Sequence, residues 1–253
     1  MDWTDNAIVL TANKHGESSL IVSLLTEQHG RHSGLVRGGA GRRNRGIYQP
    51  GNLVNAHWRA RLPEHLGAFT CELTSAHAAT LLDQPLELSV LASACAIVEA
   101  ALPERETHPS VYNGLLVVLE SLDDSNVWPT VYIKWEIGLL QELGFGLDLT
   151  ACAATGQTED LIYVSPKSGR AVSREAGEPY RDKLLQLPEF LVGPEPQCQQ
   201  DDLYAALKLT GYFLEKHAYG HADHRRMPQS RTRLLNRART LSRLGFNDQD
   251  ETD

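Results

Sequence analysis

The sequence predicts an α+β protein in which a small β-barrel is followed by a bundle of helices. Up to about residue 75, apolar and polar side chains alternate in short runs, which is the period of half-buried strands. After Thr74 the apolar residues recur at helical spacing, and proline repeatedly stands where a helix would begin. We therefore expect a barrel domain at residues 1–75, a helical domain at 76–246 and an acidic tail at 247–253.

The barrel is expected to contain five short strands. The alternating runs span residues 8–12, 20–24, 31–37, 54–61 and 68–73. A polar turn at residues 14–17 predicts a hairpin between the first two runs, and four glycines between residues 38 and 46 place a loop before the fourth. Five strands in so short a segment favour a closed barrel of the OB-fold type, an architecture well known for binding oligonucleotides.

The helices are expected where apolar residues recur over wide faces. The helical runs span residues 86–101, 111–122, 131–143, 201–219 and 228–244. Pro85, Pro109 and Pro129 fit the first turns of the first three. An irregular insertion at residues 146–179 interrupts the series and contains two short β-like runs. Because wide apolar faces must be covered, we expect the helices to pack as a bundle.

Positive charge is segregated into two windows that contain no acidic residue. Residues 28–63 and 224–247 hold 14 of the 24 basic side chains, so the rest of the chain has 10 basic residues against 32 acidic ones. The net charge of −8 therefore conceals two cationic patches. All 14 residues are arginine, whose planar group binds phosphate through two hydrogen bonds. This pattern is typical of a site for a polyanion and indicates nucleic acid as the partner.

The first window supplies the candidate nucleic-acid-binding residues. They are its arginines and the aromatic ring that follows the glycine-rich loop: Arg31, Arg37, Arg42, Arg43, Arg45, Arg59, Arg61 and Tyr48. We expect Tyr48 to stack on a base, whereas Trp58 falls on the apolar phase of its strand and is expected in the core.

The second window supplies a secondary basic patch. Its candidate residues are Arg225, Arg226, Arg231, Arg233, Arg239 and Arg243. On the last expected helix, Leu234, Ala238 and Leu241 form an inward stripe. A solvated charged face without a ligand is the competing interpretation of both windows.

The sequence contains little that supports a membrane span, a metal site or a nucleotide-binding site. No charge-free apolar run reaches the roughly 18 residues of a membrane span, and the N-terminus does not resemble a signal peptide, so a cytoplasmic protein is expected. The four cysteines form no C-x-x-C pair, and no Walker A or G-x-G-x-x-G motif is present. The spacing His217-x3-His221-x2-His224 could hold a metal on one helical face, but Gly220 disfavours the continuous helix that this site requires.

Several motifs occur in an order that is typical of one family. They are Ala7-Ile8-Val9-Leu10, Leu35-Val36-Arg37-Gly38, Gln49-Pro50-Gly51, Trp135-Glu136, Leu139-Leu140-x2-Leu143-Gly144, Leu147-x-Leu149-x2-Cys152 and Tyr163-Val164-Ser165-Pro166-x2-Gly169. In this order and spacing they make the chain resemble RecO, a family of bacterial DNA repair and recombination mediators, from about Trp3 to Leu244.

The resemblance implies an N-terminal OB-fold, a helical domain and, in some members, a zinc site of four cysteines. Here Thr155 stands where the C-x-x-C begun by Cys152 would end, and no thiol lies near Ala171 or Arg174 to supply the second pair. One thiolate does not satisfy tetrahedral zinc, so we expect a degenerate zinc-knuckle-like insertion without a metal.

The resemblance also implies a function in the RecF type of recombination pathway. Such a protein binds single- and double-stranded DNA, anneals complementary strands, and works with a RecR-like partner to load recombinase onto DNA coated by single-strand-binding protein. It would also bind the acidic C-terminal tail of single-strand-binding protein, for which Lys134 and the C-terminal arginines are candidates. Because none of these steps changes a covalent bond, we expect no catalytic residue and no cofactor, and we expect the protein at the nucleoid.

Two other functions stay open. An OB-fold module for RNA would use the same arginines. A DNA-processing enzyme would need a metal or a nucleotide.

Overall fold

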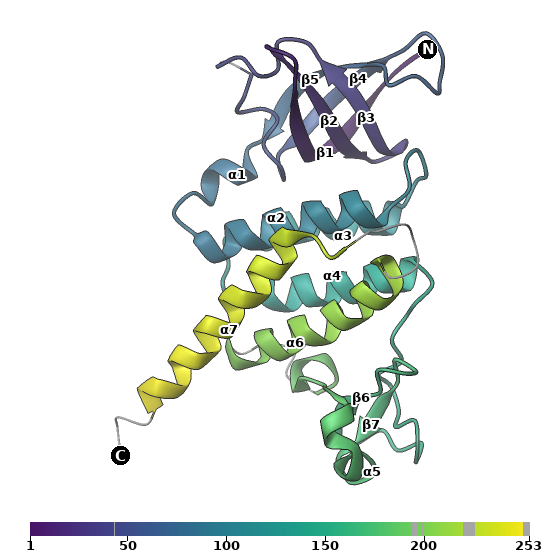
Figure 1. Ribbon diagram of the computed structural model, residues 1–253, viewed down its shortest axis with the longest axis vertical. Coiled ribbons are helices and arrows are strands. Elements are labelled where there is room, and N and C mark those ends of the chain that lie inside the picture. Colours follow the sequence, from purple (N-terminus) through teal and green to yellow (C-terminus); the bar gives the residue numbers. More distant parts are fainter. Residues whose placement is uncertain (43, 194–196, 199, 220–225, 250–253) are drawn as a thin grey trace. The chain divides into compact units, whose positions relative to one another are not determined.

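The computed structural model describes residues 1–42, 44–193, 197–198, 200–219 and 226–249. The chain divides into two compact units, Met1–Asp123 and Asp124–Asp253. The elements of both are labelled in Figure 1. No helix in the described part of the chain is long and apolar enough to cross a membrane.

The first unit begins with the predicted five-stranded barrel. Its strands are β1 (Asp2–His15), β2 (Ser19–Thr26), β3 (Gly30–Val36), β4 (Leu53–Arg59) and β5 (Ala68–Ser75). They close in the order β1-β2-β3-β5-β4, because the long β1 pairs with β4 through its first half and with β2 through its second half. The parallel pair β3–β5, through Leu35 and Ala68, completes the barrel. The expected OB-fold barrel is thus confirmed.

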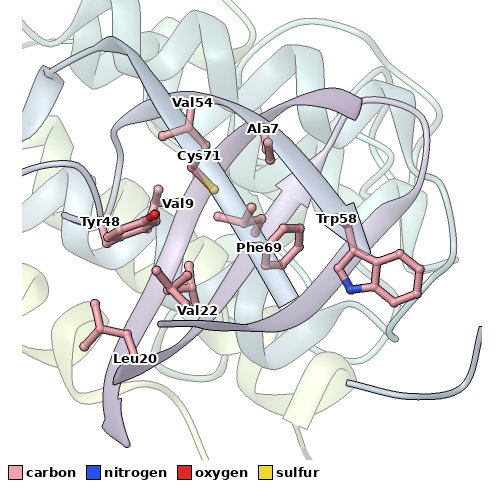
Figure 2. Packing of buried hydrophobic residues seen from close by; sticks show 12 residues of the cluster. Ala7, Val9, Leu20, Val22, Tyr48, Val54, Trp58, Phe69 and Cys71 are labelled. Atoms are coloured by element: carbon pink, nitrogen blue, oxygen red, sulfur yellow. The ribbon is translucent and has the colours of Figure 1, made fainter. Parts of the chain in front are cut away.

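The barrel interior is filled by alternate side chains of its strands. Figure 2 shows this core, which includes Val9, Leu20 and Phe69. Trp58 is 2% exposed and its indole nitrogen donates a hydrogen bond to the Leu66 carbonyl at 3.1 Å, so the predicted core position of this residue is confirmed. Burial of the ring removes a large apolar surface from water and thereby stabilises the barrel.

Three helices follow the barrel within the first unit. They are α1 (His77–Thr80), α2 (Pro85–Ala101) and α3 (Pro109–Ser121), and proline occupies the first turn of α2 and α3 as predicted. Helix α2 packs closely on the barrel, since the Cys95 thiol donates a hydrogen bond to the Val9 carbonyl at 3.6 Å. Gly51 approaches Leu91 so closely that a Cβ atom would lie 2.6 Å from its side chain. These contacts explain why the compact unit extends beyond the domain boundary expected at residue 75.

The second unit is mainly helical. It contains α4 (Trp128–Glu142), α6 (Gln200–Phe213), the π-helical turn η3 (Leu214–Tyr219) and α7 (Gln229–Gln249). Leu234 and Ala238 of α7 are buried, which confirms the inward stripe at these positions, and Leu241 is half-buried. Residues 247–249 of the expected tail are the last turn of α7, and residues 250–253 lie outside the described range.

The insertion between α4 and α6 is a small sheet with short helices. Its elements are β6 (Leu161–Val164), β7 (Ala171–Ser173), α5 (Arg174–Gly177), η1 (Glu178–Lys183), β8 (Leu185–Gln186) and η2 (Glu189–Leu191). The Cys152 sulfur accepts hydrogen bonds from the backbone nitrogen and the hydroxyl of Ser173, at 3.3 and 3.4 Å. Burial opposes ionisation of this thiol, but hydrogen bonds from Ser173 and Thr155 outweigh it and lower the pKa of Cys152 to about 6.

Metal-ligating side chains do not cluster in the described ranges. No group of three or more His, Cys, Asp or Glu residues there could hold a metal ion. This statement does not cover the candidate metal site at His217, His221 and His224, because His221 and His224 lie outside the described residues.

Candidate nucleic-acid interface

Five of the expected arginines of the first unit are exposed. They are Arg37, Arg42, Arg45, Arg59 and Arg61. None of them forms an ion pair with a described residue. Arg43 lies outside the described residues. Free guanidinium groups in water keep their capacity to bind phosphate, because no internal carboxylate already occupies their donors.

Strand pairing brings the backbone positions of Arg37, Arg59 and Arg61 to one end of the barrel. The end of β3 meets the start of β5, where the Leu35 nitrogen donates to the Gly67 carbonyl at 3.1 Å. The end of β4 meets the same point, because Arg59 is the cross-strand partner of Ala68. Cationic residues at the ends of β3 and β4 and in the loop after β4 therefore lie at the same end of the barrel.

The glycine-rich loop carries Arg42 and Arg45 on a series of hydrogen-bonded turns. The nitrogen of Arg45 donates to the Gly41 carbonyl at 3.0 Å. At the base of the loop, the Asn52 side-chain amide donates to the Gly46 carbonyl at 2.8 Å. The Ala40 nitrogen donates to the Ser18 carbonyl at 2.9 Å, which joins the loop to the β1–β2 turn. The backbone that carries the loop arginines is thus held by several hydrogen bonds within the barrel unit.

A pocket lies between this loop and the β1–β2 turn. Its volume is about 450 Å³, and its lining includes Leu20, Ala40 and Tyr48 together with the charged residues Lys14, Glu17 and Arg45. The sequence pattern does not identify Lys14 as a site residue, because Lys14 lies outside the acid-free windows, in the turn at residues 14–17. Its nearness to Arg45 depends on the way in which the loop folds back over the hairpin.

Tyr48 does not form the surface stacking platform that the sequence predicted. Its side chain belongs to the barrel core and is only 5% exposed. Figure 2 shows it at the same end of the core as Leu20. Burial and the neighbouring Cys71 raise the pKa of Tyr48 to about 12. The residue can contribute only the small part of its surface that faces the pocket.

Arg31 is also placed differently from the expectation. Its Nε donates to the Leu102 carbonyl at 2.9 Å, and its Nη1 lies 3.1 Å from Glu99 and 3.5 Å from Glu104. The side chain is 13% exposed. Arg31 therefore joins β3 to the end of α2, and two carboxylates compete with phosphate for its charge.

Arg231, expected in the secondary patch, lies in the interior of the second unit. It is 2% exposed and binds the Glu136 carboxylate with both Nε and Nη2, at 2.7 and 3.0 Å. Nη2 also donates to the Leu207 carbonyl at 2.7 Å. Thr210 donates to Glu136 and completes this network. A buried guanidinium with these partners has no surface to offer to DNA.

The remaining arginines of the secondary patch are exposed where they can be described. They are Arg226, Arg233, Arg239 and Arg243, while Arg225 lies outside the described residues. Because Leu234 and Ala238 face inward, the helical spacing keeps Arg233, Arg239 and Arg243 off the buried stripe of α7. This surface is the second cationic region of the chain.

The barrel also carries partly exposed aromatic residues that the sequence pattern does not identify. Trp3 of β1 stacks on His29 with ring centroids 4.1 Å apart and an interplanar angle of 6°. The Asp5 carboxylate contacts the His29 ring nitrogen Nδ1 at 2.9 Å and holds the imidazole against the indole. The face of Trp3 that meets His29 is thereby occupied.

The chain matches known proteins along most of its length. The family description Recombination protein O N terminal matches residues 1–76, and Recombination protein O C terminal matches residues 82–226. The DNA repair protein RecO of Rhodospirillum centenum is 52% identical over 94% of this chain and 95% of that protein. Proteins of the same name from Rhodospirillum rubrum and Phenylobacterium zucineum are each 48% identical over 96% of this chain, and over 98% and 100% of their own lengths. The chain belongs to the RecO family, as its motifs predicted.

Proposed function

We propose that this protein is a DNA repair and recombination mediator that binds single- and double-stranded DNA and anneals complementary strands. The observation that carries the proposal is the set of exposed arginines on the OB-fold barrel that form no ion pair with any described residue. The chain is also related over nearly its whole length to proteins named DNA repair protein RecO. Exposed arginines on such a barrel suit a phosphate backbone, because their binding releases condensed counterions.

Annealing follows from charge neutralisation and requires no covalent step. Two DNA strands repel each other through their phosphates, so a protein that neutralises both lowers the barrier to base pairing. In this proposal the barrel, residues 1–75, binds one strand through Arg37, Arg42, Arg43, Arg45, Arg59 and Arg61. The exposed arginines of α7 form a second cationic surface for DNA. The protein acts as a mediator, not as an enzyme.

The test is binding of fluorescent single-stranded DNA by the full chain over a range of salt concentrations. The double variant Arg42→Ala/Arg45→Ala should bind about tenfold more weakly, and the slope of log affinity against log salt should become shallower by about 1.4, or roughly 0.7 for each lost phosphate contact. A matched control removes two exposed cations of the insertion, Lys167→Ala/Lys183→Ala, and should leave both values nearly unchanged. Equal losses in the two variants would show that binding depends only on net charge.

Two further arms separate the open alternatives. Competition with RNA of equal length should displace the DNA poorly, and a strong preference for RNA would favour an RNA-binding module. Incubation of DNA with the protein, Mg²⁺ and ATP should leave every phosphodiester bond intact. Cleavage that one carboxylate substitution abolishes would establish an enzyme instead.

The family relationship supports more specific roles. We propose that the protein acts at the nucleoid in the cytoplasm, with a RecR-like partner, to load recombinase onto DNA coated by single-strand-binding protein. The acidic tail of single-strand-binding protein would bind a cationic surface of the second unit, for which the exposed Lys134 and the arginines of α7 are candidates. A peptide of that tail should bind the wild-type chain more tightly than Lys134→Ala or Arg239→Ala/Arg243→Ala. Equal binding to all three proteins would remove these residues from the proposal.

A further inference from the structure

The pocket between the β1–β2 turn and the glycine-rich loop combines buried apolar surface with exposed charge. Leu20 and Tyr48, which are 8% and 5% exposed, belong to the barrel core and also line the pocket. Figure 2 shows these two side chains at the same end of the core. Lys14, Glu17 and Arg45 contribute exposed charged side chains to the same pocket. A ligand with a flat, mostly apolar part and an anionic part would satisfy both kinds of lining.

The size and charge of the pocket fit one nucleotide of a DNA strand. Its volume of about 450 Å³ falls within the roughly 300–1,000 Å³ that is usual for small-ligand pockets. Two cations, Lys14 and Arg45, outnumber the single carboxylate of Glu17. That carboxylate can accept a hydrogen bond from the N–H groups on the Watson–Crick edge of a base.

The location of the pocket connects it to the proposed DNA-binding surface. Arg45 belongs both to the pocket and to the glycine-rich loop, so a strand bound by that loop would lie beside the pocket. The loop is joined to the β1–β2 turn by the hydrogen bond from Ala40 to Ser18, which keeps the two walls together. The pocket therefore lies where a bound strand can reach it.

We propose that this pocket receives one unpaired nucleobase of the bound DNA strand while Lys14 and Arg45 bind adjacent phosphates. The inference rests on the proposed function and adds a means of distinguishing single strands from duplex. A base within a duplex is stacked and paired, so its entry would cost the energy of unstacking and unpairing. An unpaired base enters without most of that cost. Arginines that contact only phosphate would not provide this distinction.

The test compares two polymers that carry the same phosphates. One is an oligothymidylate of about 12 nucleotides, within the 4–16 nucleotides that one OB-fold covers, and the other is a sugar–phosphate chain of equal length without bases. Full-length wild-type protein should bind the oligothymidylate about tenfold more tightly or better, since contact with a single base is commonly worth that much. The sugar–phosphate chain reports the contribution of charge alone.

Two variants should separate the contribution of the base to binding from the contribution of the phosphates. Ala40→Phe fills the pocket without changing any charge, and it should remove the preference for oligothymidylate while it leaves binding of the sugar–phosphate chain unchanged. The matched control Ala79→Phe places the same side chain on an exposed position of α1 and should retain the preference. Lys14→Met/Arg45→Met should weaken binding of both polymers about tenfold and leave their ratio near the wild-type value.

Several outcomes would overturn the proposal. Equal binding of the two polymers by the wild-type protein, a measurement that needs no variant, would show that no base is held. A preference that survives in Ala40→Phe would place the base elsewhere, whether binding stays at the wild-type level or falls equally for both polymers. Competition by thymidine monophosphate as strong as that by the strand would make the pocket a site for free nucleotides. Failure of the wild-type protein to bind either polymer would instead contradict the proposed DNA-binding function itself.

Discussion

Replacement of Arg231 by alanine should destabilise the second unit strongly and affect DNA binding only through that loss. The substitution leaves the Glu136 carboxylate, which is 0% exposed, without its main counter-charge. Burial by itself lowers the pKa of Arg231, but the Glu136 carboxylate outweighs burial and the pKa is raised, so Arg231 stays charged in the folded protein. Breaking a buried ion pair by removing one partner costs about 3–5 kcal/mol.

This loss is large compared with the stability of an ordinary domain, which is roughly 5–15 kcal/mol. Thermal unfolding of the second unit, followed by helical circular dichroism, should therefore begin roughly 10 °C lower or more. Arg233→Ala is the matched control, because Arg233 is exposed on the same helix and should cost no more than about 0.5 kcal/mol. A second variant, Arg231→Met/Glu136→Met, removes both charges and should recover most of the loss.

Two results would contradict this role of Arg231. If Arg231→Ala unfolds at the temperature of Arg233→Ala, the buried ion pair contributes nothing to stability. If Arg231→Ala keeps wild-type stability but binds DNA more weakly, Arg231 contacts DNA, as the sequence alone had suggested.

Three other predictions concern the rest of the chain. Arg31→Ala should lower the stability of the first unit by about 2 kcal/mol, since hydrogen bonds to charged groups contribute about that much, but it should change the salt slope of DNA binding very little. A slope that is shallower by about 0.7, the value for one lost phosphate contact, would place Arg31 on the DNA. Gly51→Ala should cost about 2–4 kcal/mol in urea unfolding, because Gly51 has a φ of +84° and a Cβ atom would lie 2.6 Å from Leu91; a variant as stable as wild type would contradict the close packing of α2. The folded-state pKa of Cys152 is lowered to about 6, below that of the unfolded thiol, so its contribution to stability is complete above the unfolded pKa and is lost as the pH falls through 6. The stability advantage of wild type over Cys152→Ala should therefore shrink from pH 9 to pH 5, and a constant difference would show that Cys152 is not ionised in the folded protein.

Much of the fold could be predicted because its signals are local. The alternation along β4 places Val54, Ala56 and Trp58 on one face, and all three are buried in the barrel. Pro85 and Pro109 mark the first turns of α2 and α3, which begin within two residues of the expected positions. Side chains two, three or four positions apart report directly on secondary structure, so no knowledge of distant contacts is required.

The candidate site could be predicted only in part. Most of the described arginines of the acid-free windows are exposed, whereas their contact with DNA stays a prediction. Arg31 and Arg231 are exceptions because their carboxylate partners lie 68 and 95 residues away in the chain. A window along the sequence contains no information about those partners.

The sequence alone is sufficient to predict the α+β class, the order of barrel and helices, and the family, because strand and helix periods and the order of motifs depend on residues that are close together in the chain. Tertiary contacts determine which of the described arginines are exposed and which are paired, that the Tyr48 ring is buried, and that Lys14 and Arg45 line the same pocket. Exposure and ion pairing depend on packing between segments that are far apart in the chain. This packing buries some arginines in ion pairs inside the protein and leaves others exposed to water.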